Sequence, residues 1–205
     1  MSIRDYGLLY WTIIGVTALL AASPFLSRVL VYPRTEFFTE LWILDANRRA
    51  ENYPYNVTRC QNYTIHLGVA NRLGYCAYYI VQVKFRNQTQ PAPTSFGPIE
   101  GRLPSSLPSL FNITVFAADE QVLEIPITFS FNYTWNEQLS RVEISGLWLN
   151  GVWLRISNCT LSWDPNKRAF RGFLFFELWL YDANRGSFIY HGRFVGLWLN
   201  MALTA

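Results

Sequence analysis

The sequence predicts a mainly β fold: an immunoglobulin-like antiparallel β-sandwich preceded by one N-terminal transmembrane helix. Residues 7–26 carry no charge, the chain beyond residue 34 alternates apolar and polar residues, and turn motifs separate the alternating segments. Alternation with a period of two is typical of half-buried strands, and several such strands with turns between them indicate a sandwich. A closed barrel is the alternative. We expect an anchor with a short linker at 1–34 and an extracytoplasmic β domain at 35–205.

The first predicted element is a membrane helix at residues 7–26. As a helix, this uncharged stretch would span about 30 Å at a rise of about 1.5 Å per residue, which matches the hydrocarbon core of a bilayer. A cleaved signal peptide is the alternative, with a shorter apolar core and a cleavage site of small residues. The nearest such site, Ala21-Ala22-Ser23, is followed by Pro24, which disfavours cleavage. We therefore expect a retained anchor whose partner is the lipid bilayer.

Four later segments alternate clearly enough to be predicted as strands. In one of them, Phe129 and Phe131 share one face while Thr128 and Ser130 share the other. Because neighbouring side chains of a strand point to opposite faces, we expect the two phenylalanines in the core and the two hydroxyl residues in solvent. The predicted strands are residues 62–69, 81–86, 124–134 and 158–163.

Two further features lie between the strands. Asn150-Gly151 is a strong signal for a two-residue hairpin, because both residues tolerate positive φ. Residues 87–110 contain five of the ten prolines. A long irregular segment in a compact domain is uncommon, and we interpret this one either as a packed crossover or as a contact surface.

Asn-x-Thr sequons occur six times beyond the apolar segment, more often than chance predicts for this composition, and none has proline in the middle. N-glycosylation requires exposure outside the cytoplasm. One arginine before the apolar segment and two after it favour the opposite orientation, but this bias is small. We expect a single-pass protein of the cell membrane with a cytoplasmic N-terminus and the β domain outside. The predicted glycosylation sites are Asn56, Asn62, Asn87, Asn112, Asn132 and Asn158.

Three stretches of the chain carry a family resemblance. Residues 37–54 read FFTELWILDANRRAENYP, residues 56–74 run from Asn-Val-Thr through Leu-Gly-Val-Ala-Asn, and residues 193–200 read RFVGLWLN. They resemble the opening segment, the next two strands and the closing strand of an archaeal family called domain of unknown function 1616 (DUF1616). The resemblance covers most of residues 36–201 and is weakest at 138–167. It implies an archaeal membrane-attached protein and transfers no catalytic residue, because the family has no assigned activity.

The sequence contains no convincing catalytic motif. His66 and His191, the two histidines, lack the spacing of metal ligands or of a nucleophile's base. Glu40 and Glu177, each near a tryptophan, suggest a glycosidase pair, but we interpret them as outward strand residues. We predict no catalytic, cofactor-binding or metal-binding residue and no cofactor. Beyond residue 34 the chain has 14 basic and 13 acidic residues, so no basic face for nucleic acid is expected.

The three cysteines are Cys60, Cys76 and Cys159. An oxidising exterior allows one disulfide among them. Cys60 and Cys76 flank a predicted strand–turn–strand unit and are expected to be too far apart for a bridge. Cys159 alternates with core-facing residues, so we expect it to be a buried small hydrophobic residue.

Aromatic residues make up 17% of the chain, and four tryptophans lie on strands opposite leucine-rich faces. Exposed indoles stack on sugars or form protein interfaces, and burial is the alternative. We expect a non-enzymatic structural or interaction role in the envelope, with an envelope glycoprotein, a glycan or another membrane protein as partner. A carbohydrate-binding module using exposed aromatic strands is the alternative, and a surface hydrolase the third. The four tryptophans are Trp42, Trp148, Trp179 and Trp198.

Overall fold

The computed structural model describes residues 3–29, 36–93 and 101–202. The chain divides after Phe37 into two compact units, a helical one and a β one. The boundary lies close to the predicted one at residues 34 and 35.

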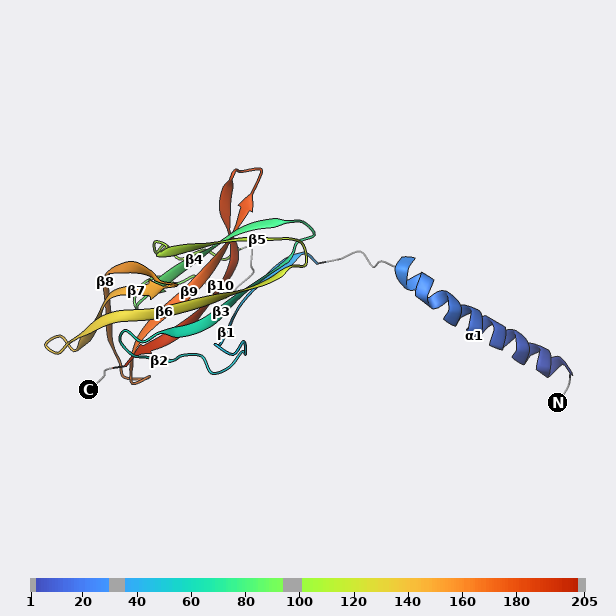
Figure 1. Cartoon of the computed structure of the whole chain (residues 1–205), viewed down its shortest axis with the longest axis horizontal. Coiled ribbons are helices and arrows are strands. Elements are labelled where there is room, and N and C mark those ends of the chain that lie inside the picture. Colours follow the sequence, from blue (N-terminus) through green and yellow to red (C-terminus); the bar gives the residue numbers. More distant parts are fainter. Residues whose placement is uncertain (1–2, 30–35, 94–100, 203–205) are drawn as a thin grey trace. The chain divides into compact units, whose positions relative to one another are not determined.

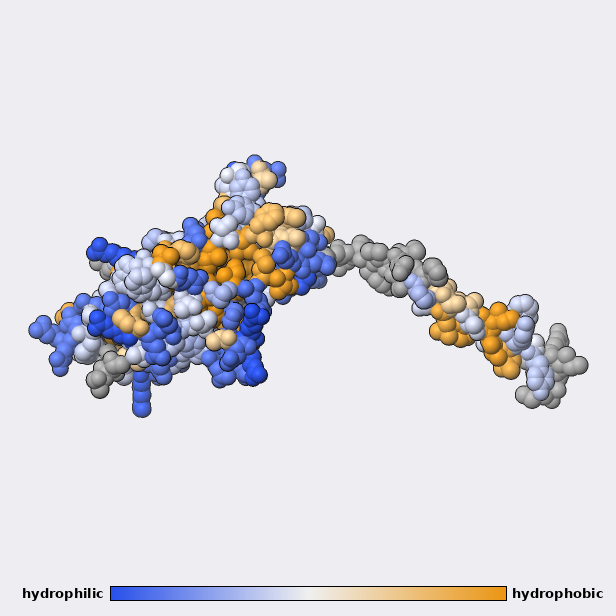
Figure 2. All heavy atoms as spheres, in the orientation of Figure 1, coloured by the Kyte–Doolittle hydropathy of each residue, from blue (hydrophilic) through white to orange (hydrophobic). Residues whose placement is uncertain are grey.

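The N-terminal unit contains the helix α1, Ile3–Val29, with Pro24 in its last turns. Apolar side chains such as Trp11, Ile13 and Leu20 are exposed along it, and Figure 2 shows apolar surface over much of its length. Among the described residues, no helix reaches the combination of length and apolar character that crossing a membrane demands. The helix predicted at residues 7–26 is therefore confirmed as a helix and not as a membrane span.

The described part of the second unit forms ten strands of one sheet (Figure 1). All pairings are antiparallel except that of β2 with β10. The strands are β1 (Phe38–Leu44), β2 (Asn56–Val57), β3 (Tyr63–Arg72), β4 (Ala77–Arg86), β5 (Phe111–Ala117), β6 (Val122–Asn136), β7 (Arg141–Leu149), β8 (Val152–Asp164), β9 (Ala169–Asp182) and β10 (Ser187–Met201).

The sheet has two halves. One half runs β1-β3-β6-β7-β8, and the other runs β5-β4-β9-β10-β2. They are joined at the short β8–β9 hairpin, where Trp163 pairs with Phe170 and Asp164 with Ala169. The sheet curls, so that buried side chains from both halves form one apolar core. Phe131 of β6, for example, packs 5.0 Å from Phe85 of β4 between ring centroids. The predicted mainly antiparallel β fold is confirmed, and each predicted strand lies within an observed one or overlaps it closely.

The alternation predicted for residues 124–134 is confirmed except at Ser130. Phe129 and Phe131 are fully buried, and Thr128 is half-buried. Ser130, expected in solvent, is only 4% exposed. It lies directly opposite Trp148 of β7, and paired residues on neighbouring strands share a face. The large indole therefore lies beside the small hydroxymethyl group and shields it from water.

A buried ion pair holds the later part of the proline-rich segment, around Ser105, on the sheet. Lys84 Nζ of β4 lies 2.7 Å from Glu177 Oε2 of β9, with both side chains almost completely buried. Ser105 completes the link, because its backbone N–H donates to Glu177 Oε1 at 2.7 Å and its carbonyl accepts from Lys84 at 2.9 Å. This part of the segment is therefore packed on the sheet as expected, but the segment is not a crossover, because it joins β4 to its direct neighbour β5.

Candidate interaction surfaces

The structure exposes only one of the four tryptophans singled out in the sequence. Trp148 is 46% exposed, whereas Trp42, Trp179 and Trp198 are half-buried. The expected continuous row of exposed aromatic side chains is therefore not formed by these four. Trp148 instead lies beside Trp153 of β8, with ring centroids 5.4 Å apart, and Trp153 is 40% exposed.

The three half-buried tryptophans have structural contacts, and the ring centroid of Trp179 lies 5.6 Å from that of Tyr190. A Cβ on Gly68 would collide with the indole of Trp42, so the absent side chain of this glycine makes room for the ring. Trp198 lies under the Arg171 guanidinium at 4.3 Å and the Arg86 guanidinium at 5.2 Å, a cation–π arrangement. These indoles are therefore parts of the packed sheet.

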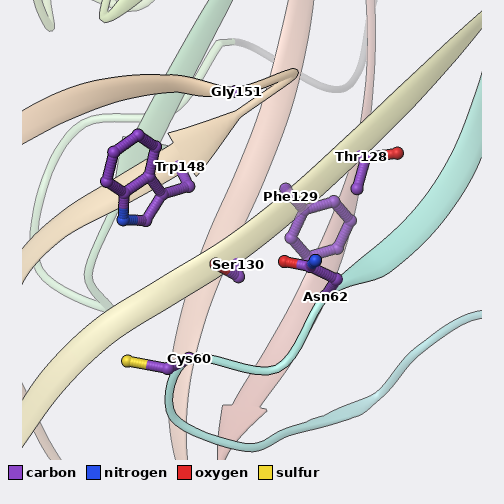
Figure 3. A pocket seen from close by; sticks show the side chains of 7 residues that line it. All are labelled: Cys60, Asn62, Thr128, Phe129, Ser130, Trp148 and Gly151. Carbon is purple, nitrogen blue, oxygen red and sulfur yellow. The ribbon is translucent and has the colours of Figure 1, made fainter.

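Trp148 forms one wall of a surface hollow of about 380 Å³. In Figure 3, β6 passes between Trp148 on one side and Cys60 and Asn62 on the other, with Ser130 along the strand. Cys60 and Asn62 come from the segment that enters β3, and Gly151 from the β7–β8 turn. We call this feature the Trp148 hollow; its lining residues are Cys60, Asn62, Thr128, Phe129, Ser130, Trp148 and Gly151.

The side chains lining the Trp148 hollow are hydroxyls, a carboxamide, a thiol and aromatic rings, with no formal charge. Charged lining groups would favour ions or phosphates, whereas an exposed indole beside neutral hydrogen-bonding groups suits a polyhydroxylated ring with an apolar face. Within the described residues, no group of three or more histidine, cysteine, aspartate or glutamate side chains could hold a metal ion.

A second hollow, of about 310 Å³, has a similar composition. Its exposed indole is that of Trp163, and its other walls include Asn87, Thr89 and Ser162. Asp164 also lines it, and this carboxylate lies 3.9 Å from Arg171. Both hollows therefore place a sequon asparagine near an exposed tryptophan.

The sequon asparagines differ in their surroundings. Asn56, Asn62 and Asn112 are exposed, whereas Asn87 and Asn132 are half-buried. Asn87 Nδ2 donates to the Thr160 carbonyl at 3.1 Å, and Asn132 Oδ1 accepts from Arg59 Nε at 3.0 Å. The side chain of Asn158 lies outside the described residues. The exposed asparagines are the more accessible acceptors.

A second interaction surface, which the sequence analysis missed, lies where β4, β5, β9 and β10 meet. We call it the aromatic cluster and define it as Tyr75, Tyr78, Phe116, Tyr181 and Phe188. Tyr78 is at its centre, with ring centroids 6.5 Å from Phe116, 6.0 Å from Tyr181 and 5.1 Å from Phe188.

The aromatic cluster is open to solvent. Phe116 is 65% exposed and Tyr75 56%, and a hollow of about 580 Å³ lies among these side chains. In Figure 1 the β9–β10 hairpin projects beyond the neighbouring strands, and Figure 2 shows apolar surface near its base. The aromatic-rich composition was a sequence signal for such a surface, but only the strand order brings Tyr78 and Phe188 together.

Both histidines are held by structural hydrogen bonds. His66 is buried, and its Nδ1 lies 3.0 Å from the Asp45 carbonyl. His191 Nε2 lies 2.9 Å from the Thr39 hydroxyl. Burial, together with the positive charge of Arg193, lowers the pKa of His191 to about 4. His191 is therefore neutral near pH 7, and its ring joins β10 to β1.

The two glutamates considered as a glycosidase pair have separate structural partners. Glu177 is buried against Lys84, so its expected outward orientation is wrong; the proline-rich segment covers that face of β9 around Ser105. Glu40 is half-buried and lies 3.4 Å from Arg72 Nε. Each carboxylate is thus engaged with a cation of a neighbouring strand.

All three cysteines are free, with Cys60 and Cys76 exposed and Cys159 buried. Burial raises the pKa of the Cys159 thiol to about 12. The expectation that Cys159 is a core residue is confirmed, and it packs in the apolar core.

No family model matches the chain, and no curated protein shows significant similarity to it. The resemblance to the DUF1616 family stays a prediction.

Proposed function

We propose that this chain is a non-enzymatic interaction protein of the cell envelope, whose β domain lies outside the cell and binds a partner protein. The observation that carries the proposal is the aromatic cluster. Exposed apolar patches mark interaction sites, and tyrosine and phenylalanine are enriched in the centres of protein interfaces. The partner that fits this surface is a protein presenting apolar side chains, because Asp182 is the one charged residue among those that line the hollow.

A non-catalytic role is supported by the contacts of the titratable groups. The carboxylate of Glu177 is engaged by Lys84 and that of Glu40 by Arg72, and both histidines hold strands or turns together. A general acid or base must be free to exchange a proton with substrate. The contacts of these side chains suit structural roles better.

The proposed location is supported by the sequons and by α1. Three of the described sequon asparagines are exposed on the β domain, as attachment of a glycan requires. Contact with a bilayer would remove the apolar side chains exposed along α1 from water, so we propose that residues 7–26 contact the lipid bilayer. An immunoglobulin-like sandwich is the fold class proposed for the β domain, with β8–β9 as the connection between its two halves.

The test is recovery of the native complex from membranes by mild detergent extraction. Replacing Phe116 and Tyr181 with serine should remove the partner, because both rings are exposed in the aromatic cluster. The control is Trp163→Ala, which removes an exposed ring in another part of the sheet and should leave the complex unchanged. A complex that survives the double serine variant, or that is lost equally in the control, would contradict the proposal.

A second candidate function is carbohydrate binding, which the Trp148 hollow favours. Its uncharged hydrogen-bonding side chains and its exposed indole suit a neutral sugar. Binding of a free oligosaccharide that Trp148→Ala abolishes and Trp153→Ala preserves would support this function over the first.

A further inference from the structure

The Trp148 hollow combines two features that the proposed function leaves unexplained. Asn62, an exposed sequon residue, forms one wall, and the exposed indole of Trp148 forms another. No hydrogen bond is made by the Asn62 carboxamide within the described part of the chain, whereas the carboxamides of Asn87 and Asn132 are engaged. Asn62 is thus a free glycan acceptor at the rim of a hollow that suits a sugar.

We propose that the Trp148 hollow holds the first sugars of an N-glycan attached to Asn62. This inference rests on the proposed function, because it requires a β domain outside the cytoplasm. The volume of about 380 Å³ falls in the range of small-molecule sites, about 300–1,000 Å³. The glycan packs the apolar face of a sugar ring on the indole, and its hydroxyls lie near Thr128 and Ser130.

Covalent attachment favours the chain's own glycan over a free one. A tethered group has a high effective concentration at a neighbouring site, so weak stacking is enough to fill it. Asn62 and Trp148 lie on opposite sides of β6 (Figure 3), so a glycan that starts at Asn62 enters the hollow by crossing this one strand. Once there, it covers an indole that is otherwise 46% exposed and excludes other sugars.

The neighbouring tryptophans provide internal controls. Trp153 packs against Trp148 and is exposed to a similar extent, yet it does not line the hollow. Trp163 lies in the second hollow, where Asn87 Nδ2 already donates to Thr160. An effect of the Asn62 glycan should therefore be confined to Trp148.

The experiment is hydroxyl-radical footprinting of the full chain, read by mass spectrometry, with glycopeptide analysis of the same samples. Wild-type protein from an N-glycosylating host is compared with Asn62→Gln from that host. Wild-type protein from a host without N-glycosylation is the control for misfolding of the variant, because it keeps Asn62 and lacks the glycan. We expect oxidation of Trp148 to be severalfold lower when Asn62 carries a glycan, with Trp153 and Trp163 unchanged.

Each other outcome overturns a specific statement. Equal oxidation of Trp148 with and without a glycan on Asn62 refutes the inference and leaves the proposed function standing. An unmodified Asn62 beside other occupied sequons also refutes it. If every sequon is unmodified in the native host, the proposed location fails as well. Protection of Trp148 in Asn62→Gln by added chitobiose would show that the hollow takes a free glycan, which is the carbohydrate-binding function instead.

Discussion

A few buried polar residues link particular strands of this fold and hold one connecting segment against the sheet. The Lys84–Glu177 pair links β4 to β9 and, through Ser105, holds the proline-rich segment between β4 and β5. Burying two charges costs solvation free energy, and the pair offsets this only while both partners remain. The pair therefore contributes more to the position of the proline-rich segment than to the net free energy of unfolding.

Removing one partner of this pair should be strongly destabilising. Glu177→Ala leaves the Lys84 ammonium buried without its carboxylate, so we expect a loss of about 3–5 kcal/mol in the free energy of unfolding. The double variant Lys84→Met, Glu177→Leu should lose much less, because no uncompensated charge remains. Urea unfolding followed by tryptophan fluorescence measures both. Equal losses would show that packing, and not charge, accounts for the effect.

The acid sensitivity of the protein should depend on His191. Its pKa is lowered from the ordinary value of 6.5 to about 4 in the folded state, so the unfolded chain binds the extra proton between these values. Stability should fall as the pH decreases from about 6.5 to about 4, by about 3 kcal/mol in total, and should be insensitive to this group outside that window. Unfolding measured at several pH values should show a flatter profile for His191→Gln. An unchanged slope in the variant would assign the effect to other groups.

At the scale of a single element, β6 shows how a strand divides its roles between two faces. Its inner face contributes Phe129 and Phe131 to the core, and Phe131 contacts Phe85 of the other half of the sheet. Its outer face contributes Thr128 and Ser130 to the Trp148 hollow. The same strand therefore supports the core and the candidate sugar site.

Mutations on the two faces of β6 should have different costs. Phe131→Ala removes a fully buried ring that joins the two halves, and we expect a loss of about 3–5 kcal/mol. Thr128→Ala, on the half-buried face, should stay below about 1 kcal/mol, the usual size of one neutral hydrogen bond, here that to Thr64. Denaturant unfolding of both variants checks this. Similar costs would mean that the outer face is packed as tightly as the core.

Across the whole molecule, the folded β domain determines which sequons remain accessible. Asn62 and Asn112 are exposed, whereas Asn87 is half-buried and donates to Thr160. Its Oδ1 also accepts from the Thr89 hydroxyl, the third residue of its own sequon. Both groups of Asn87 are thus held by neighbouring parts of the fold.

Glycan occupancy should follow this accessibility. We expect Asn62 and Asn112 to be modified to a greater extent than Asn87, because a carboxamide must leave its hydrogen bonds to reach the transferase. Quantitative glycopeptide mass spectrometry of protein from the native host measures the three sites. Occupancy that is highest at Asn87 would contradict the prediction and would indicate transfer before the domain folds.

The sequence by itself determined the local properties of this chain. Alternation identified β3, β4, β6 and β8, because burying one face of a strand imposes a period of two on neighbouring residues. The helical segment was also evident, because apolar residues fill it without a charge, and it lies within α1. The burial of Cys159 followed from the same alternation.

Only the tertiary structure decided which residues meet across the sheet. Trp148 stayed exposed and Trp198 became enclosed by two arginines, although both occur in the same Gly-Leu-Trp-Leu-Asn context. Ser130 was buried by its cross-strand partner, and Tyr78 met Phe188 from a strand more than a hundred residues away in sequence. Exposure on the outer face of a sheet depends on which strands and segments lie beside it, and a periodic pattern within one strand contains no information about them.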